Sequence, residues 1–206
     1  MIKMKLNLAP TTEPITTKDC KEHMRVELGD MEEDAYIWSL ILTVRKYTEE
    51  YTGLALIDQT WKMWLDDWPD QDYIEIPKPP LIWTVVDSYI KYKNTAGTES
   101  TWAATNYIVE NDTDRQGRIV LAYGKTYPGI QLYPSNPIEI KFDCGYSSAA
   151  NVPEPIKHAM KMLVAELFEN REITVWGMAV TGKLDWFHRL LDNYVYPCYG
   201  DPNTLV

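Results

Sequence analysis

Apolar residues recur at spacings of three and four along residues 31–52, which is the pattern of an amphipathic helix. Asp30 and Glu33 resemble a capping box at its start, and Gly53 is a natural C-cap at its end. We expect the apolar stripe to pack and the charged residues to lie mostly on the opposite, water-facing side. The stripe comprises Ile37, Leu40, Ile41, Val44, Tyr47 and Tyr51, and the charged positions are Glu32, Glu33, Arg45, Lys46, Glu49 and Glu50.

Further helices are predicted on either side of this one. A short helix precedes it, capped by Thr17 and ending near Arg25. A second long apolar stripe runs through residues 156–170, and the prolines just before it are tolerated because the amides of a first helical turn are unpaired. Residues 183–194 repeat the pattern. The chain therefore begins and ends with helices.

Between these helices, from about residue 58, apolar and polar residues alternate and turn residues interrupt the pattern. The alternation predicts six strands without a helical segment between them, which indicates an antiparallel sheet or a small barrel. The loop at residues 111–117 is expected to join two of the strands as a hairpin. The predicted strands are residues 61–65, 73–76, 83–93, 107–110, 118–122 and 137–143.

The order of helices, strands and helices predicts an α+β protein. Neither helical part is long enough to form a good core alone, so we expect the N- and C-terminal helices to pack as one bundle with the β unit inserted. The expected parts are an N-terminal arm (1–14), a helical part (15–57), an inserted β domain (58–150), a second helical part (151–195) and a C-terminal tail (196–206).

Composition excludes several classes of protein. The chain has 206 residues, 45% of them hydrophobic, without an apolar run near the roughly 20 residues of a membrane helix, so a folded protein without a membrane span is expected. The chain reaches Pro10 without an apolar segment, so we expect no secretory signal and an intracellular protein. Cys20, Cys144 and Cys198 are widely spaced, which favours reduced thiols over disulfides.

Charge and aromatic content narrow the picture further. The net charge of −10 divides into −3 for residues 1–57, −5 for residues 58–150 and −2 thereafter, so no region is predicted to be a basic DNA clamp. Eight Trp and fourteen Tyr against three Phe favour rings with a polar atom, which suit half-buried positions in sheets and at protein interfaces. This bias favours a protein that works through its surface.

The sequence offers little for catalysis. It contains no P-loop, dinucleotide-binding, nucleophile-elbow or zinc-protease motif, so we predict no catalytic residue and no cofactor. Cys20 and His23 lie one turn apart on a predicted helix, but a metal site needs further ligands, so ordinary helix positions are the favoured interpretation and no metal is predicted. Trp64 and Trp68 stand among acids that suggest either a sugar-stacking platform with a carboxylate pair or, as we favour, a soluble turn. These acids are Asp66, Asp67, Asp70 and Asp72.

Nine short segments occur in a distinctive order along residues 15–195. They are HMRV (23–26), DMEED (30–34), RKYTEEYTGLAL (45–56), QTW (59–61), IPKPPL (76–81), GRIVL (117–121), FDCGY (142–146), VPEPIKHA (152–159) and ENRE (169–172). In this order the chain resembles the head–tail connector proteins of tailed bacteriophages, in the form with an inserted β domain. The resemblance rests on the order of these segments and not on one diagnostic site.

The resemblance implies a structural virion protein without catalysis. It implies a ring of copies of the chain, twelve in the virion, that acts as an adaptor between the portal protein and a stopper or tail-completion protein. Such a ring lies at the virion neck, after assembly in the host cytoplasm, and extends the channel used for viral genome ejection. Double-stranded DNA is then expected to pass through the lumen without specific binding.

Contact residues are expected at the end of the long third-part helix, in the connection after it and in the tail. The charged helix end has a second interpretation as a helix-dipole interaction, and the apolar connection residues have one as a cover for the core. Residues expected to contact neighbouring copies are Glu166, Glu169, Arg171, Trp176 and Met178, and those expected to contact the portal are Tyr196, Pro197 and Tyr199.

Two other functions stay open at this point. One is a carbohydrate-binding or hydrolytic module built on the Trp-rich β domain, and the other is a different neck or tail-terminator component. For the aromatic sheet face around Trp61, Trp64 and Trp83, a simple role in the core is a further alternative.

Overall fold

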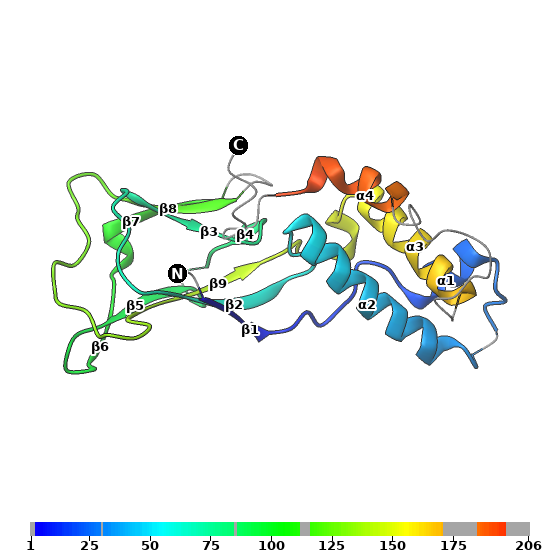
Figure 1. The fold of residues 1–206 in the computed structure, drawn as a ribbon, viewed down its shortest axis with the longest axis horizontal. Coiled ribbons are helices and arrows are strands. Elements are labelled where there is room, and N and C mark those ends of the chain that lie inside the picture. The colour runs from blue at the N-terminus through cyan, green and yellow to red at the C-terminus, as the bar shows by residue number, and fades with distance from the viewer. Residues whose placement is uncertain (1–2, 30, 85, 112–115, 171–184, 197–206) are drawn as a thin grey trace. The chain divides into compact units, whose positions relative to one another are not determined.

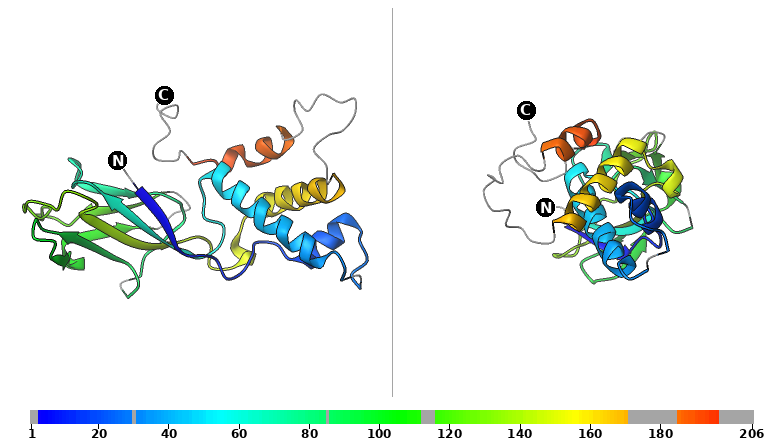
Figure 2. Two further views of the ribbon diagram at one scale, coloured as in Figure 1. Left: turned by 60° about the horizontal axis from the view of Figure 1, so that its bottom comes forward. Right: turned by 90° about the vertical axis from the view of Figure 1, so that its right-hand side faces the viewer.

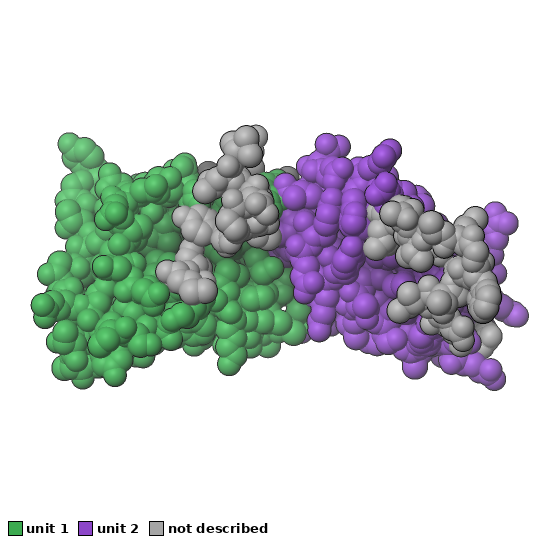
Figure 3. Space-filling model, viewed as in Figure 1, with its two compact units in different colours: residues 1–10, 58–145, 196–206 green, residues 11–57, 146–195 purple. Residues whose placement is uncertain are grey.

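A computed structural model describes residues 3–29, 31–84, 86–111, 116–170 and 185–196. The chain forms two compact units, shown in different colours in Figure 3. Unit 1 contains residues 1–10, 58–145 and 196–206, and unit 2 contains residues 11–57 and 146–195. Unit 1 holds the strands and unit 2 holds the α-helices, so the α+β class predicted from the sequence is confirmed.

Unit 2 is built from helices that pack on one another. Helix α3 contacts α1, α2 and α4, and α1 also contacts α2. Figures 1 and 2 show α2 and α3 side by side, although they are about a hundred residues apart in the chain. The helices are α1 (Thr17–Met24), α2 (Asp34–Thr52), α3 (Glu154–Glu169) and α4 (Asp185–Leu191), with short 3-10 turns η2 (Ala149–Asn151) and η3 (Asp192–Tyr194).

The helix ends agree with the predictions only in part. Thr16, and not Thr17, caps α1, because its hydroxyl accepts from the Asp19 amide while the Asp19 carboxylate accepts from the Thr16 amide. Helix α2 begins later than predicted, at Asp34, and its N-cap Glu33 makes no side-chain capping bond. The predicted partner Asp30 lies outside the described residues. Gly53 ends α2 as predicted, with φ of 73° and its amide bonded to the Glu49 carbonyl oxygen.

The buried face of α2 differs from the predicted stripe. Ile37, Ile41 and Val44 are buried as expected. Arg45 and Glu49, which were expected to face water, are buried as well. That part of the prediction is wrong because both side chains belong to a buried ion network, described below.

Unit 1 is built from antiparallel strands in two sheets. The larger sheet has the order β1-β2-β9-β5-β6, with β4 also paired to β9, and the smaller has the order β3-β8-β7. Figure 1 shows them as two layers. The strands are β1 (Lys3–Leu8), β2 (Gln59–Leu65), β3 (Tyr73–Ile76), β4 (Leu81–Ile82), β5 (Tyr89–Lys93), β6 (Glu99–Thr101), β7 (Tyr107–Glu110), β8 (Gly117–Leu121) and β9 (Ile138–Cys144).

Five of the predicted strands coincide with β2, β3, β7, β8 and β9, and β7 and β8 pair as the expected hairpin. The strand predicted at residues 83–93 is wrong in its first half, because Ser88 returns its amide to the Thr84 carbonyl oxygen and makes a turn there. The edge strands β1 and β6 were not predicted. Their side chains are mostly exposed, so they carry little apolar alternation.

The core of unit 1 lies between the two sheets. Met63, Ile140 and Ile90 are register partners on neighbouring strands of the larger sheet and are fully buried. Gly117 on β8 lies so close to β4 that a Cβ there would overlap the Leu81 side chain. None of the helices in the described ranges has the length and apolar character that crossing a membrane requires.

Candidate functional site

The predicted contact residues of the long helix lie at the C-terminal end of α3. Glu169 is its last residue and is exposed, and Glu166 is half-buried. The Asn170 side chain donates to the Glu166 carboxylate (Nδ2 to Oε1, 3.0 Å). The charged end of α3 is thus open to other molecules at Glu169, whereas Glu166 is partly engaged by its own helix.

The other predicted contact residues follow α3 and η3 in the chain. Arg171, Trp176, Met178, Pro197 and Tyr199 lie outside the described residues. Tyr196 is half-buried and follows η3 by two residues. The assignment of these positions to subunit and portal contacts therefore stays a prediction.

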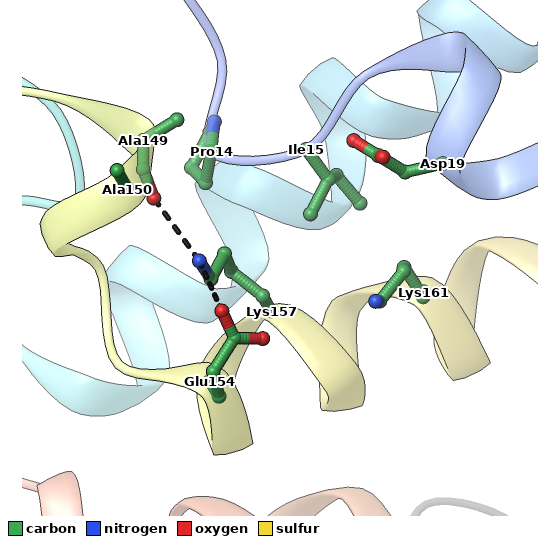
Figure 4. A pocket seen from close by; sticks show the side chains of 8 residues that line it. All are labelled: Pro14, Ile15, Asp19, Ala149, Ala150, Glu154, Lys157 and Lys161. Atoms are coloured by element: carbon green, nitrogen blue, oxygen red, sulfur yellow. Dashed lines mark hydrogen bonds and ion pairs between the residues drawn. The ribbon is translucent and has the colours of Figure 1, made fainter.

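A polar pocket of about 240 Å³ opens in unit 2 beside the start of α3 (Figure 4). Lys157 Nζ lies 3.2 Å from the Ala149 carbonyl oxygen, to which it donates, and 2.6 Å from the Glu154 carboxylate. Asp19, on the opposite wall, is engaged in the cap of α1. The pocket was not predicted from the sequence. The polar groups of Lys157, Glu154 and Asp19 are already engaged in contacts that stabilise η2, α1 and α3. The lining residues are Pro14, Ile15, Asp19, Ala149, Ala150, Glu154, Lys157 and Lys161.

A group of rings joins α2 to α4. The His188 ring stacks on Tyr51 at 4.3 Å between centroids, and its Nε2 shares a 2.9 Å hydrogen bond with Tyr47 Oη. Tyr51 donates to Asp192 (2.6 Å), and this bond, with burial, raises the pKa of Tyr51 to about 12. His188 therefore links α4 to α2.

The cysteine and histidine pair on α1 has a structural environment. Cys20 is buried and free, and burial, followed by the charge of Asp19, raises the pKa of the Cys20 thiol to about 12. The His23 ring meets the His158 ring edge-on at 5.8 Å. Across the described residues, no three His, Cys, Asp or Glu side chains are grouped to hold a metal ion.

Aromatic rings also cluster in unit 1, at the turn that follows β2. Trp68 stacks on Tyr127 at 4.9 Å and contacts Trp102 at 5.3 Å, and Trp102 contacts Tyr107 at 5.1 Å. These rings pack on one another instead of forming an open platform, and Trp102 is buried. The acids of the turn, Asp66, Asp67, Asp70 and Asp72, are exposed. The arrangement agrees with the favoured interpretation of a soluble turn.

The outer face of the larger sheet carries a polar network centred on Glu139. Its carboxylate accepts from Lys62 Nζ (2.9 Å), Trp64 Nε1 (3.0 Å) and Tyr89 Oη (2.7 Å). Burial raises the pKa of Glu139, but the three hydrogen bonds outweigh it and lower that pKa below its usual value. Trp64 is half-buried and its N–H is satisfied here, while Trp61 and Trp83 are also half-buried, so none of the three is a fully buried core residue.

The lowered pKa of Glu139 predicts a loss of stability in acid. A carboxylate with a depressed folded-state pKa adds stability above the unfolded value of about 4.5, and this is lost as the pH falls through the folded value. We expect Glu139→Gln to lower the free energy of unfolding by about 1–2 kcal/mol at pH 7 and by much less at pH 3, as measured by urea unfolding. Glu110→Gln, at an exposed ion pair on β7, is the control and should change it by less than about 1 kcal/mol. A deficit for Glu139→Gln that does not vary with pH would contradict the assignment.

A second network, buried in unit 2, was missed in the sequence. Arg45 Nε donates to Glu13 Oε2 (2.7 Å) and Arg45 Nη1 donates to Glu49 Oε2 (2.9 Å), and all three side chains are buried. The other oxygen of Glu49 accepts from the Leu56 amide (2.9 Å). The network ties the segment before α1 and the segment after α2 to the middle of α2.

The fold of this chain is similar to that of chains in known particle structures. Neither a protein-family model nor a curated protein matches the sequence. A chain from the neck of an empty gene transfer agent (GTA) particle, computed with C6 symmetry, matches with a TM-score of 0.75 and 22% identity, over 97% of this chain and 98% of that chain. This chain shares its fold with GTA particle chains.

Two further matches also cover almost the whole of this chain. A chain from the virion of a native GTA particle matches with a TM-score of 0.73 and 20% identity, over 96% of this chain and 98% of the other. A chain from the neck of a native GTA particle, computed with C12 symmetry, matches with a TM-score of 0.66 and 21% identity, over 94% of this chain and 98% of the other. The shared fold includes the β unit as well as the helices, because almost the whole length of each chain is covered.

Proposed function

We propose that this protein is a structural component of the neck of a phage-like particle. In the proposed role it forms a ring adaptor between the portal and the stopper or tail, without catalysis, and extends the DNA exit channel. The observation that carries the proposal is the fold shared with chains of GTA neck structures over 94–97% of this chain. The proposed location is the head–tail junction, reached after assembly in the host cytoplasm.

The proposed ring contains twelve copies of the chain. The matching neck structures were computed with C6 and with C12 symmetry, and a ring of twelve copies is compatible with both. A ring requires two different patches on each subunit that meet on neighbouring copies. For one patch we propose the end of α3 and the residues after it, namely Glu166, Glu169, Arg171, Trp176 and Met178. For the portal contact we propose Tyr196, Pro197 and Tyr199.

The experiment that tests the function combines the purified protein with its portal. Co-sedimentation of the two proteins, and density for the protein at the neck in electron micrographs of the particle, are the expected results. Absence from the neck, or no binding to the portal, would refute the proposal. Density farther along the tail would instead identify a tail-terminator component.

Charge reversal tests the proposed subunit contact. We expect Arg171→Glu to weaken ring formation in sedimentation velocity while the circular dichroism spectrum and the unfolding transition stay unchanged, because a like charge then meets the neighbouring copy. Arg189→Glu makes the same change of charge at an exposed position on α4 and should form rings normally. Normal rings with Arg171→Glu would remove Arg171 from the interface.

A further inference from the structure

Six lysines project from one face of the larger sheet in unit 1, although the chain as a whole is acidic. Side chains at alternate strand positions share a face, and the strand registers place all six on the outward side, opposite the buried face of Met63 and Ile140. We call this surface the lysine face. Its lysines are Lys3 and Lys5 on β1, Lys62 on β2, Lys141 on β9, and Lys91 and Lys93 on β5.

The charges on this face are segregated from the rest of unit 1. Unit 1 contains ten Lys and Arg against fourteen Asp and Glu. At the outward strand positions of the larger sheet stand six of those cations and only three acids, Glu99, Glu139 and Asp143. The regional charges predicted no basic surface because they also count the acids in the turns and in the smaller sheet, such as Asp66, Asp70 and Glu75. The shared face of the six lysines appears only in the strand register, which places buried apolar side chains on the opposite face.

Three of the lysines form a row across neighbouring strands. Lys5 is the register partner of Lys62, and Lys62 is the partner of Lys141. Like charges directly opposite on adjacent strands destabilise a sheet. Glu139 neutralises Lys62, but Lys5 and Lys141 form no ion pair with any residue that the structure describes. The row therefore holds positive charge that the described part of the fold does not use.

The side chains are accessible to a partner. Lys3 forms an ion pair with Asp66, and Lys91 and Lys93 form ion pairs with Glu99, yet the side chains of these three lysines are 37–47% exposed. Lys5 is exposed as well. The ammonium groups of Lys91 and Lys141 lie 4.7 Å and 6.0 Å from the centroid of the Tyr89 ring. The aliphatic side chains at outward positions, Leu8 and Ile82, stand at the end of the sheet that carries Thr60 and Asp143.

We infer that the lysine face binds the phosphate backbone of double-stranded DNA, independently of sequence. Lysine binds phosphate as a point charge, whereas protein interfaces are enriched in arginine and depleted in lysine. The six cations include no arginine for bidentate readout of a base, and the Trp64 N–H is already bonded to Glu139. The chemistry therefore favours a nucleic-acid backbone over an acidic protein as the partner.

This inference deepens the proposed function by naming the surface that meets DNA, and it rests on that function only for the place of the contact in the particle. Binding by the isolated protein needs neither portal nor ring. Failure of portal co-sedimentation and failure of DNA binding are therefore separate results.

The test measures binding of the purified protein to a fluorescent duplex of about 20 base pairs by anisotropy, from about 50 to 200 mM NaCl. We expect weak binding that falls steeply with salt, with a log–log slope of no more than about 5 in magnitude because at most six phosphates are neutralised. The triple variant Lys5→Gln/Lys91→Gln/Lys141→Gln should weaken binding at least tenfold and reduce the slope by about 2–3. Circular dichroism checks that this variant is folded.

The matched control is Lys18→Gln/Lys46→Gln/Lys125→Gln, which removes the same charge at exposed positions off the lysine face and should bind DNA like the unmodified protein. An equal loss in both variants would mean that total charge, and not this face, governs binding, and would overturn the inference. No binding by the unmodified protein at about 50 mM salt would overturn it as well. Self-association that the first triple variant abolishes, in the absence of DNA binding, would reassign the face to a protein interface.

Discussion

Arg45→Met is expected to lower the free energy of unfolding by about 3–5 kcal/mol, the range found when one partner of a buried ion pair is removed. Methionine keeps most of the volume but leaves Glu13 and Glu49 buried without their shared cation, whose nitrogens now lie 2.7 and 2.9 Å from the two carboxylates. The Leu56 amide would still donate to Glu49, but a single neutral donor does not balance two negative charges. Urea unfolding of both proteins at pH 7 measures the difference.

The loss should depend on pH in a defined direction. Burial already raises the pKa of Glu13 even with Arg45 beside it, and removal of Arg45 raises it further. A carboxyl group with a raised folded-state pKa destabilises the fold above its unfolded pKa of about 4.5, so the deficit of Arg45→Met should shrink as the pH falls toward that value. The control is Arg118→Met at an exposed ion pair with Glu110, with an expected loss below about 1 kcal/mol. A loss below 1 kcal/mol for Arg45→Met would show that the network contributes little.

Phe142→Ala is expected to have an effect of similar size in unit 1. Phe142 is fully buried in the central strand β9, opposite Trp61 on β2. Removal of a buried phenyl group forfeits its transfer free energy and leaves a cavity, which together cost about 3–5 kcal/mol. The measurement is the free energy of unfolding from urea titration, followed by tryptophan fluorescence.

A control substitution at an exposed strand position in the same unit separates the effect of burial on stability from the effect of strand propensity. Ile108 on β7 is 57% exposed, and Ile108→Ala should cost less than about 1 kcal/mol. Equal losses for Phe142→Ala and Ile108→Ala would mean that the two sheets do not share the tightly packed core described above.

The elements that the sequence predicted are those with a strong local signal. Helix α2 has an apolar residue every three or four positions and a C-terminal glycine, and β9 alternates buried and half-buried residues along its whole length. Such signals depend only on neighbours in the chain. The start of α2, after its N-cap Glu33, was predicted too early because the acidic run there offers several residues of similar capping chemistry.

The features that were missed depend on partners far along the chain. Nothing near Arg45 shows that Glu13, 32 residues earlier, buries it, because a charged residue on an amphipathic helix normally faces water. The lysines can be read from the sequence. That Lys5, Lys62 and Lys141 share a face, however, depends on the register of three strands from distant segments. Of the predicted contact residues, Glu166, Glu169 and Tyr196 are described, and their contacts with partners stay predictions.

The pairing of β2 with β9 has a consequence for synthesis on the ribosome. Lys62 and Glu139, which meet across these strands, are 77 residues apart in the chain. At a synthesis rate of about 5–20 residues per second, β9 is made on the order of 4–15 s after β2, so the inner edge of β2 stays unpaired for that time. The interval between the synthesis of α2 and that of α3, which packs on it, is longer still. Both compact units are therefore completed only by the last third of the chain, and a nascent or truncated product exposes the apolar faces of both.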